Sequence, residues 1–522
     1  MDFPLSLVPL PVRLELPGGD DFVLRPGAAI TAGPLCQVAA EELAAILRRS
    51  TGFDLPIKEA SSTGGIALVV DPGFVLEAAA GGPTPAEGYA LTSDSSGVVI
   101  RGASPAGLFN GVQTLRQLLP ADVESPSAVQ ADWRVPAVGI EDFPRFSYRG
   151  LMLDVARSFL DVAEVKRQID TMVQFKFNAL HLHLTDDQAW RIDIRNPERN
   201  PSGLDYGALT GLGGTGAVDA PGLGLGPGHP GFYSQAEFSE IVAYAERRNV
   251  LIVPEVDMPG HVNAALAAVP QLNANNDAPA MNTTGEVGFS SLDANNPVTY
   301  EFAREVIHQL AELTPGPYLH IGGDEALVTP HGEYLALVSE IASMVVEAGK
   351  IPVGWNEYAA ARIPHGSVIQ YWHGSTSATV QKTSDAGASV IMSPAEHTYL
   401  DQKYEPSSPI GLSWVEGGPF SWRQYYAWDP ARLGVPEDRV LGLEGPLWTE
   451  TVRGGLQADW LLYPRALALA EVAWTPQETR RASALGQRLG QLGARLALQG
   501  VAFAPAPDVD WAARPTSPFH DI

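Results

Sequence analysis

Two adjacent carboxylates, Asp324 and Glu325, follow directly after a short apolar segment. Residues 318–323 read Tyr-Leu-His-Ile-Gly-Gly, a run with strand character that ends in two glycines. Two acids at the end of a buried strand indicate that they bind a ligand or act on it chemically. Glycine lets a ligand or a second backbone approach closely. A solvated strand end with an acidic turn would show the same pattern, so the rest of the chain must distinguish the two.

Other polar and aromatic residues follow apolar segments elsewhere in the chain. They are Asp154, Arg157, Asp186, Asp187, Glu255, Asp257, His261, Trp355, Asn356, Glu357, Tyr371, Trp372, His373, Tyr399, Asp401, Trp448 and Glu450. Carboxylates with one arginine and several tryptophans are typical of a sugar site, because hydroxyls need charged partners while the C–H faces of a sugar ring stack on indole. Glycoside hydrolysis also needs a proton donor with a raised pKa. The set therefore favours a glycoside hydrolase.

The segments that precede these residues are predicted to be eight β-strands. Their expected ranges are 148–155, 179–185, 250–256, 318–322, 351–355, 367–372, 388–393 and 440–448. Helical patterns are predicted between them at 161–175, 234–248, 297–313 and 333–347. This alternation predicts an α/β fold with a (β/α)8 barrel, in which the carboxyl ends of the strands converge on one face. An open doubly wound sheet would usually carry a glycine-rich phosphate loop, which the chain lacks.

Two helix starts and one long loop give further signals. Asp161 with Glu164, and Ser234 with Glu237, have the spacing of capping boxes. The Gly- and Pro-rich stretch 203–232 is expected to be a long loop after the second strand, where it would shape a substrate entrance.

A smaller α+β domain is predicted at 1–140, before a catalytic barrel at 141–505 and a C-terminal tail at 506–522. The small domain is expected to contain strands at 22–24, 66–70 and 97–101 and helices at 35–49 and 104–119. The stretch 121–135 is rich in Pro, Ser and Ala and is interpreted as a linker or crossover. No catalytic cluster precedes it, so we expect the small domain to support the barrel.

Composition excludes several classes of partner. The chain has 522 residues, enough for a large core and an accessory domain. A formal charge of −26 argues against nucleic acid, which requires clustered Lys and Arg. No apolar stretch of about 18 residues is present, so no membrane span is expected. The first residues lack the features of a signal peptide, which predicts a cytoplasmic protein as the sequence stands and leaves secretion open if a leader was removed.

A metal site is the rival use of the acids and histidines. His181, His183 and His320 lie within predicted strands, and no His-Glu-x-x-His spacing occurs. Cys36 is the only cysteine, which leaves neither a disulfide nor a cysteine-ligated metal. We therefore interpret the three histidines as core or supporting residues and expect no metal and no other cofactor.

Four motifs of the predicted barrel are highly specific when they occur together. They read Arg-Gly-Leu-Met-Leu-Asp-Val-Ala-Arg at 149–157, His-Leu-His-Leu-Thr-Asp-Asp-Gln-Ala-Trp-Arg at 181–191, Pro-Glu-Val-Asp-Met-Pro-Gly-His at 254–261 and His-Ile-Gly-Gly-Asp-Glu at 320–325. In these motifs, and over nearly its whole length, the chain resembles glycoside hydrolase family 20, the β-N-acetylhexosaminidases. Ser158 departs from the pattern, because many relatives carry His after the arginine.

The resemblance implies a mechanism for the tandem acids. In this family the substrate's own 2-acetamido carbonyl attacks the anomeric carbon and gives an oxazolinium intermediate, with no protein nucleophile. Glu325 would be the general acid and then the base that activates water. Asp324 would hold the acetamido N–H and stabilise its developing charge, and Tyr399 would hydrogen-bond the acetamido oxygen.

The resemblance also implies a substrate pocket for one terminal N-acetylhexosamine. Trp355, Trp372 and Trp448 would enclose the acetamido methyl group, and Trp414 would add a further aromatic wall. The hydroxyls of the non-reducing sugar would be bound by Arg157, Asp401 and Glu450, which suggests exo action. The acid would be supported by Asp186, Asp257 and His261.

Three alternatives stay open at this point. A noncatalytic sugar-binding barrel could keep the pocket, although the intact acid pair and Tyr399 argue against it. A conventional glycosidase with two catalytic carboxylates would act on glucosides or galactosides that lack the acetamido group. A member of the family could also release a disaccharide. The sequence does not separate N-acetylglucosamine from N-acetylgalactosamine, since the two sugars differ only at the C4 hydroxyl.

Overall fold

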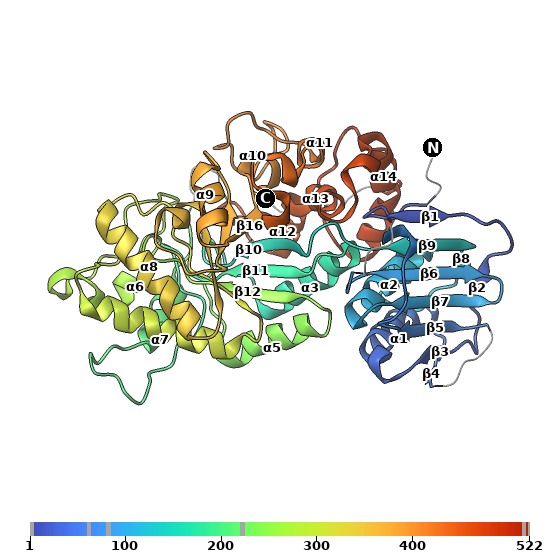
Figure 1. The fold of residues 1–522 in the computed structure, drawn as a ribbon, viewed down its shortest axis with the longest axis horizontal. Helices are drawn as coiled ribbons and strands as arrows, with labels where there is room; N and C mark the ends of the chain where they lie inside the picture. The colour runs from blue at the N-terminus through green and yellow to red at the C-terminus, as the bar shows by residue number, and fades with distance from the viewer. Residues whose placement is uncertain (1–4, 60–63, 80–84, 220–224, 514–517, 520–522) are drawn as a thin grey trace.

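The computed structural model describes residues 5–59, 64–79, 85–219, 225–513 and 518–519. A small α+β domain lies beside a closed barrel of parallel strands (Figure 1). Among the described residues, no helix is long and apolar enough to cross a membrane.

The small domain is built on a seven-stranded sheet in the order β1-β9-β6-β7-β5-β3-β4. Its strands are β1 (Arg13–Glu15), β3 (Ile30–Ala32), β4 (Ile57–Lys58), β5 (Ile66–Val70), β6 (Tyr89–Asp94), β7 (Gly97–Gly102) and β9 (Val138–Asp142). Helices α1 (Gln37–Thr51) and α2 (Pro105–Leu118) contribute apolar faces to one core with this sheet. The predicted strands and helices of this domain are confirmed.

The predicted linker at 121–135 is partly ordered into secondary structure. It begins with the 3-10 helix η3 (Ala121–Glu124) and ends in β8 (Arg134–Val135). Strand β8 pairs antiparallel with β2 (Phe22–Val23), so the segment returns to the small domain. The sequence did not predict strand β8 because only two residues form it, too few to show a periodic pattern.

Eight parallel strands close the barrel, as predicted. They are β10 (Tyr148–Asp154), β11 (Ala179–His183), β12 (Leu251–Glu255), β13 (Tyr318–His320), β14 (Ile351–Trp355), β15 (Val368–Tyr371), β16 (Ser389–Met392) and β17 (Val440–Leu447). Pairing of β10 with β17 completes the ring. One buried apolar layer fills its amino-terminal end: Tyr148, Ala179, Val253, Val353, Val368 and Ile391.

The four predicted helices between the strands are present. They are α3 (Val162–Met172), α5 (Gln235–Glu246), α7 (Pro297–Leu313) and α8 (His331–Glu347). Both predicted capping boxes form, at the starts of α3 and α5. Further helices that the sequence analysis did not name are α4 (Gly207–Gly211), α6 (Asn263–Ala268), α9 (Ser377–Asp385), α10 (Ala395–Thr398), α11 (Trp422–Tyr426), α12 (Gly455–Leu462), α13 (Arg465–Trp474) and α14 (Ala482–Leu498).

The C-terminal segment packs against the barrel side of the molecule. Val501 and Phe503 belong to the main core, and the backbone N–H of Ala512 donates to the carbonyl of Gly490 in α14. Of the tail predicted at 506–522, residues 514–517 and 520–522 lie outside the described residues.

A buried ionic cluster joins the two domains. Lys176, at the end of the segment after α3, places its Nζ 2.7 Å from Oδ2 of Asp142 and 2.9 Å from the hydroxyl of Tyr89. Trp474 of α13 donates from its indole Nε1 to Oδ1 of Asp142 at 2.8 Å. Because Asp142 and Tyr89 belong to the small domain, these bonds hold that domain against the outside of the barrel.

Candidate active site

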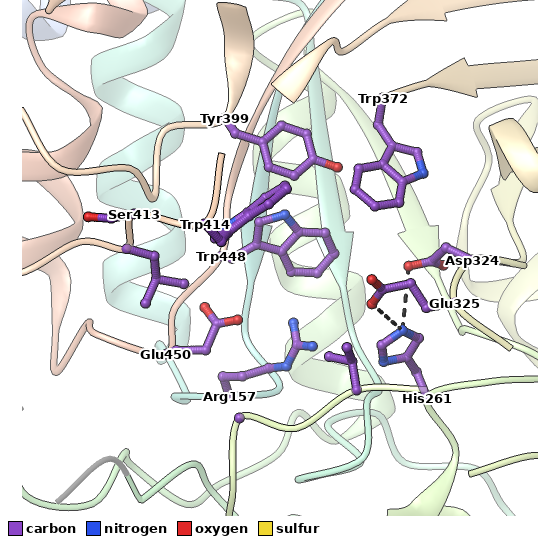
Figure 2. A pocket seen from close by; sticks show the side chains of 13 residues that line it. Arg157, His261, Asp324, Glu325, Trp372, Tyr399, Ser413, Trp414, Trp448 and Glu450 are labelled. Atoms are coloured by element: carbon purple, nitrogen blue, oxygen red, sulfur yellow. Dashed lines mark ion pairs between the residues drawn. The ribbon is translucent and has the colours of Figure 1, made fainter. Parts of the chain in front are cut away.

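A cavity of about 400 Å³ opens at the carboxyl ends of the barrel strands (Figure 2). Its lining consists of Arg157, His261, Gly285, Val287, Asp324, Glu325, Trp372, Tyr399, Leu412, Ser413, Trp414, Trp448 and Glu450. The structure therefore brings together residues that lie some 300 positions apart in the chain, as convergence in a barrel predicts.

The two glycines before the acids are needed for the turn that presents them. Gly322 and Gly323 have φ values of 67° and 94°, and Glu325 itself has a φ of 45°. A Cβ atom on Gly322 would lie 1.7 Å from Oδ1 of Asp257. The backbone N–H of Gly323 donates to that oxygen at 3.0 Å. The close approach expected for these glycines is thus made by Asp257, which holds the turn from behind.

His261 lies between the two acids and a third carboxylate, Asp186. Its Nε2 is 3.5 Å from Oδ2 of Asp324 and 3.5 Å from Oε2 of Glu325 (Figure 2). Its Nδ1 lies 3.1 Å from Oδ1 of Asp186. Burial alone would lower the pKa of His261, but the negative charges of Asp186 and Asp324 raise it well above its ordinary value. The side chain is therefore an imidazolium that bridges these carboxylates.

Asp324 shares its surroundings with Asp257. Burial raises the pKa of Asp324 to about 7, although the positive charge of His261 opposes the rise. Burial and the charge of Asp324 raise the pKa of Asp257 well above its usual range. Oδ2 of Asp257 and Oδ1 of Asp324 have no hydrogen-bond partner among the described residues. Because the pKa of Asp257 is raised further than that of Asp324, Asp257 is the neutral member of the pair and Asp324 the charged one.

Arg157 and Glu450 line one end of the cavity (Figure 2). Nη2 of Arg157 lies 2.8 Å from Asp186, and Nη1 lies 3.3 Å from Asp154. Its guanidinium group is 5.0 Å from the ring centroid of Trp448. Burial raises the pKa of Glu450 to about 7, and its Oε2 has no partner among the described residues. A ligand that enters the cavity therefore finds a fixed cation and an acid with a free oxygen.

Aromatic rings form the walls of the cavity. Trp372 and Tyr399 lie nearly parallel, with ring centroids 6.1 Å apart and an angle of 18° between their planes. Trp414 meets both rings edge-on, at 6.1 Å and 5.5 Å. Trp448 lies beside them and faces the cavity (Figure 2). Rings in this arrangement offer flat apolar faces to a sugar or its substituents.

Two residues predicted to contact substrate lie behind the lining. Trp355 is 1% exposed and packs with its ring centroid 5.9 Å from that of Trp448. Asp401 is fully buried, and its Oδ2 accepts a hydrogen bond from Nε1 of Trp414 at 3.1 Å. Each side chain therefore contacts a tryptophan that lines the cavity: Trp355 contacts Trp448, and Asp401 contacts Trp414.

A buried polar layer supports this site from inside the barrel. We define it as His181, His183, Glu255, His320, Gln370 and Glu444, all at most 1% exposed. Glu255 is its centre: it lies 3.1 Å from Nε2 of His181 and 2.9 Å from Nδ1 of His320, and it also contacts Nδ1 of His183. The interpretation of the three histidines as core or supporting residues is confirmed. His181, Glu255 and His320 offer atoms close enough for a metal ion, but Oε1 of Glu255 already accepts a hydrogen bond from Nε1 of Trp355, and Nδ1 of His320 accepts one from the backbone N–H of Gly322.

Several residues of the site were not assigned a role from the sequence. Glu357 accepts a hydrogen bond from Nε1 of Trp372 at 3.0 Å, and Oδ1 of Asn356 accepts from the backbone N–H of the same tryptophan. The run Trp-Asn-Glu at 355–357, at the end of a predicted strand, could have indicated that Asn356 and Glu357 belong to the site. Gly285, Val287 and Ser413 lie on irregular loops, where no periodicity marks them.

The long loop predicted at 203–232 does not line the cavity in its described part. The backbone N–H of Val218 instead donates to the carbonyl of Arg157 at 2.8 Å, so the loop fixes Arg157 from behind. The loop residues that line the cavity are instead Gly285, Val287, Leu412, Ser413 and Trp414. Residues 220–224 lie outside the described part of the chain.

Comparisons with known proteins agree with this geometry. The model of the glycosyl hydrolase family 20 catalytic domain matches residues 146–334 and 329–477, and that of the family's domain 2 matches residues 5–143. The chain belongs to glycosyl hydrolase family 20. It is therefore a glycoside hydrolase of the β-N-acetylhexosaminidase family, and the resemblance seen in the four motifs is confirmed.

Relatives of the family 20 chain match it over nearly its full length. A β-N-acetylhexosaminidase from Cellulomonas fimi is 38% identical over 519 residues, which cover 98% of this chain and 99% of that protein. The structure of a family 20 β-N-acetylhexosaminidase from Streptomyces coelicolor A3(2) matches with a TM-score of 0.88 and 40% identity, over 98% of this chain and 100% of that one. A mutant Streptomyces plicatus β-hexosaminidase, in complex with its product GlcNAc, matches with a TM-score of 0.89 and 40% identity, over 98% of this chain and 99% of that one.

Proposed function

We propose that this family 20 enzyme is an exo-acting, retaining β-N-acetylhexosaminidase. It removes a terminal β-linked GlcNAc or GalNAc by substrate-assisted catalysis. The observation that carries the proposal is the pair Asp324 and Glu325 at one cavity that also holds Tyr399 and the tryptophans. The GlcNAc bound in the Streptomyces plicatus relative supports the same sugar class for this chain.

Glu325 is the general acid and base of the proposed reaction. Its side chain is 31% exposed, so it can meet both the glycosidic oxygen and water at the cavity mouth. In the first step it protonates the glycosidic oxygen while the acetamido oxygen bonds to the anomeric carbon and the aglycone leaves. In the second step it takes a proton from water, whose oxygen attacks the anomeric carbon and reopens the oxazolinium ring.

Asp324 and Tyr399 act on the acetamido group. As a carboxylate, Asp324 accepts the acetamido N–H and offsets the positive charge that develops on that group. Burial raises the pKa of Tyr399 well above its ordinary value, so its hydroxyl keeps its proton and can donate to the acetamido oxygen. Trp372 and Trp448 then exclude water and hold the oxygen in a near-attack position.

The end of the cavity that Arg157 and Glu450 line supports exo action. In the proposed reaction Arg157 and Glu450 bind the hydroxyls of the terminal sugar, and Asp401 supports them by accepting a hydrogen bond from Trp414. A further sugar on that side would have to displace this buried group. The pocket accordingly accepts one terminal residue.

Hydrolysis of p-nitrophenyl N-acetyl-β-glucosaminide beside the matching β-glucoside tests the proposal. Cleavage of the first alone is expected, because only that substrate carries the acetamido nucleophile. Comparable cleavage of both would indicate a protein nucleophile. If neither is cleaved but oligosaccharides bind, the barrel is a sugar-binding protein or an enzyme for a longer glycan.

A further inference from the structure

The turn that carries Glu450 is linked to a distant loop by one arginine side chain. Glu450 lies between β17, which ends at Leu447, and α12, which begins at Gly455, so no strand or helix fixes its backbone. Nη1 of Arg453 donates to the backbone carbonyl of Glu450 at 2.9 Å, and Nε of Arg453 donates to the carbonyl of Gly226 at 3.0 Å. Arg453 therefore joins the turn after the last barrel strand to the loop that follows β11.

The same loop holds the backbone of Arg157. The N–H of Gly228 donates to the carbonyl of Val218 at 2.6 Å, and the N–H of Val218 donates to the carbonyl of Arg157 at 2.8 Å. A Cβ atom on Gly228 would lie 2.6 Å from that carbonyl oxygen of Arg157, so glycine is needed for this approach. Hydrogen bonds and a short piece of main chain thus connect the backbone of Glu450, through Arg453, to the backbone of Arg157.

Further contacts fix the loop on its other side. The backbone N–H of His229 donates to Oγ of Ser158 at 3.2 Å, and Nη1 of the fully buried Arg191 donates to the carbonyl of Gly231 at 2.8 Å. Ser158, where many relatives carry histidine, therefore belongs to this set of contacts. Because the loop is bonded at several points, it is a fixed support to which Arg453 can hold the turn of Glu450.

The two residues connected in this way are the ones proposed to bind the sugar hydroxyls. Arg157 and Glu450 lie together at one end of the cavity (Figure 2), and Oε2 of Glu450 has no hydrogen-bond partner among the described residues. A hydrogen bond weakens steeply when its distance or angle departs from the optimum, so the direction of this oxygen depends on the backbone turn that carries it.

We propose that Arg453 is a positioning residue that fixes Glu450 relative to Arg157. It thereby sets how strongly the enzyme requires the hydroxyl groups of the terminal sugar. This inference rests on the proposed function, since it concerns the sugar-binding end of that active site. Arg453 itself does not line the cavity, and it acts through the main chain of Glu450.

The 3-, 4- and 6-deoxy analogues of p-nitrophenyl N-acetyl-β-glucosaminide provide the test. We define the hydroxyl ratio as kcat/KM for the parent substrate divided by kcat/KM for a deoxy analogue. In the wild type the largest hydroxyl ratio should be about 10 to 100, because removal of a bound hydroxyl leaves buried polar groups unpaired. A ratio near one for all three analogues would overturn the proposal, since Glu450 would then bind no hydroxyl.

Arg453→Met keeps the apolar stem of the side chain and removes its donors. The largest hydroxyl ratio should fall to about three or less, because the parent substrate loses rate while the corresponding deoxy analogue stays within about two-fold. Equal losses on all four substrates would show a general structural role and contradict the proposal. If this variant does not fold, Arg453→Lys takes its place, since it keeps the charge but lacks the planar fork of donors. A reduced ratio is again expected, and an unchanged one would count against Arg453.

A double-mutant cycle shows whether Arg453 acts through Glu450. In the Glu450→Ala background, Arg453→Met should lower kcat/KM on the parent substrate by no more than about two-fold, because the group that it positions is already absent. Fully additive losses would contradict the proposal. Arg304→Met is the matched control: Arg304 contacts Glu347 between α7 and α8, its side chain is 52% exposed, and its loss should leave every hydroxyl ratio unchanged.

Binding measurements separate this inference from the proposed reaction. If p-nitrophenyl N-acetyl-β-glucosaminide is not cleaved, the proposed function fails, but calorimetry with GlcNAc and its deoxy analogues still tests Arg453. The wild type should bind GlcNAc about ten-fold or more tightly than the most affected analogue, and Arg453→Met should remove most of that difference. The same difference in both proteins, or no binding of GlcNAc to the wild type, would refute the role of Arg453.

Discussion

Nε1 of Trp355 donates a hydrogen bond to Oε1 of Glu255 across 2.9 Å. This bond ties the aromatic wall of the active site to the buried polar layer, because Trp355 packs directly behind Trp448. The surrounding histidines lower the pKa of Glu255 well below its usual range despite its burial. A fixed anion at the centre of the barrel thus sets the position of Trp355, the ring that packs behind the cavity wall.

Replacement of that anion should loosen the acetamido pocket. In Glu255→Gln the negative charge is lost and an amide N–H₂ replaces one acceptor, so Trp355 and the histidines cannot all keep their partners. We expect kcat/KM on the N-acetyl substrate to fall about 10- to 100-fold. The decisive readout is the ratio of kcat/KM for N-acetyl and N-propionyl substrates, which should decrease as the wall gains freedom. An unchanged ratio would mean that Glu255 serves stability alone, and Glu240→Gln on the surface is the control.

The acid limb of the pH profile should report Asp324. Its pKa of about 7 means that the carboxylate required for catalysis is lost as the pH falls through that value, so kcat/KM should decline by up to about ten-fold per pH unit below it. The positive charge of His261 lowers this pKa. In His261→Asn the limb should therefore move to higher pH, in addition to any loss of rate. A limb that stays in place in this variant would assign the ionisation to another group.

Glu325→Gln should separate the acid role from binding. For an alkyl or sugar leaving group, loss of the proton donor should lower kcat by about 10²- to 10⁴-fold. A p-nitrophenyl leaving group needs no protonation, so its release in a pre-steady-state burst should be affected far less. KM for poor substrates should change little, because Arg157 and Glu450, which we propose to bind the sugar hydroxyls, are unchanged in this variant. Equal losses in both assays would argue that Glu325 positions the substrate instead.

Much of the barrel could be predicted because each of its strands is indicated by a short local sequence pattern. A segment such as 351–355 is apolar, ends at polar residues and lies between helical patterns, so β14 (Ile351–Trp355) was predicted to the residue. Strand β1 was missed for the opposite reason. Its three residues, Arg13–Glu15, pair with Gly139–Glu141 of β9, and nothing local indicates a partner so far along the chain.

The site could likewise be predicted where its residues belong to a local motif, and could not be predicted where their position depends on the fold. Asp324 and Glu325 carry their signal in the chain itself, since two glycines precede them. The depth of a side chain depends on neighbouring strands, so the sequence did not show that Trp355 and Asp401 lie behind the lining. Loop residues such as Val287 have neither periodicity nor motif, and only the fold brings them to Glu325.

The contact between the two domains should contribute strongly to stability. Nζ of Lys176 lies 2.7 Å from Asp142 and 4.4 Å from the ring centroid of Trp474, and both ionic side chains are at most 1% exposed. Lys176→Ala would leave the Asp142 carboxylate buried without its cation. We expect a loss of about 3–5 kcal/mol in the free energy of unfolding, measured by urea denaturation.

A partly exposed ion pair gives the control for this effect. Lys166 contacts Glu240 on the barrel surface, where the two side chains are 21% and 58% exposed. Solvent screens such a pair, so Lys166→Ala should cost at most about 1 kcal/mol. If Lys176→Ala is no more destabilising than Lys166→Ala, the buried pair does not hold the small domain to the barrel. If the small domain instead unfolds in a separate transition at lower urea in Lys176→Ala alone, the pair is what couples the unfolding of the two domains.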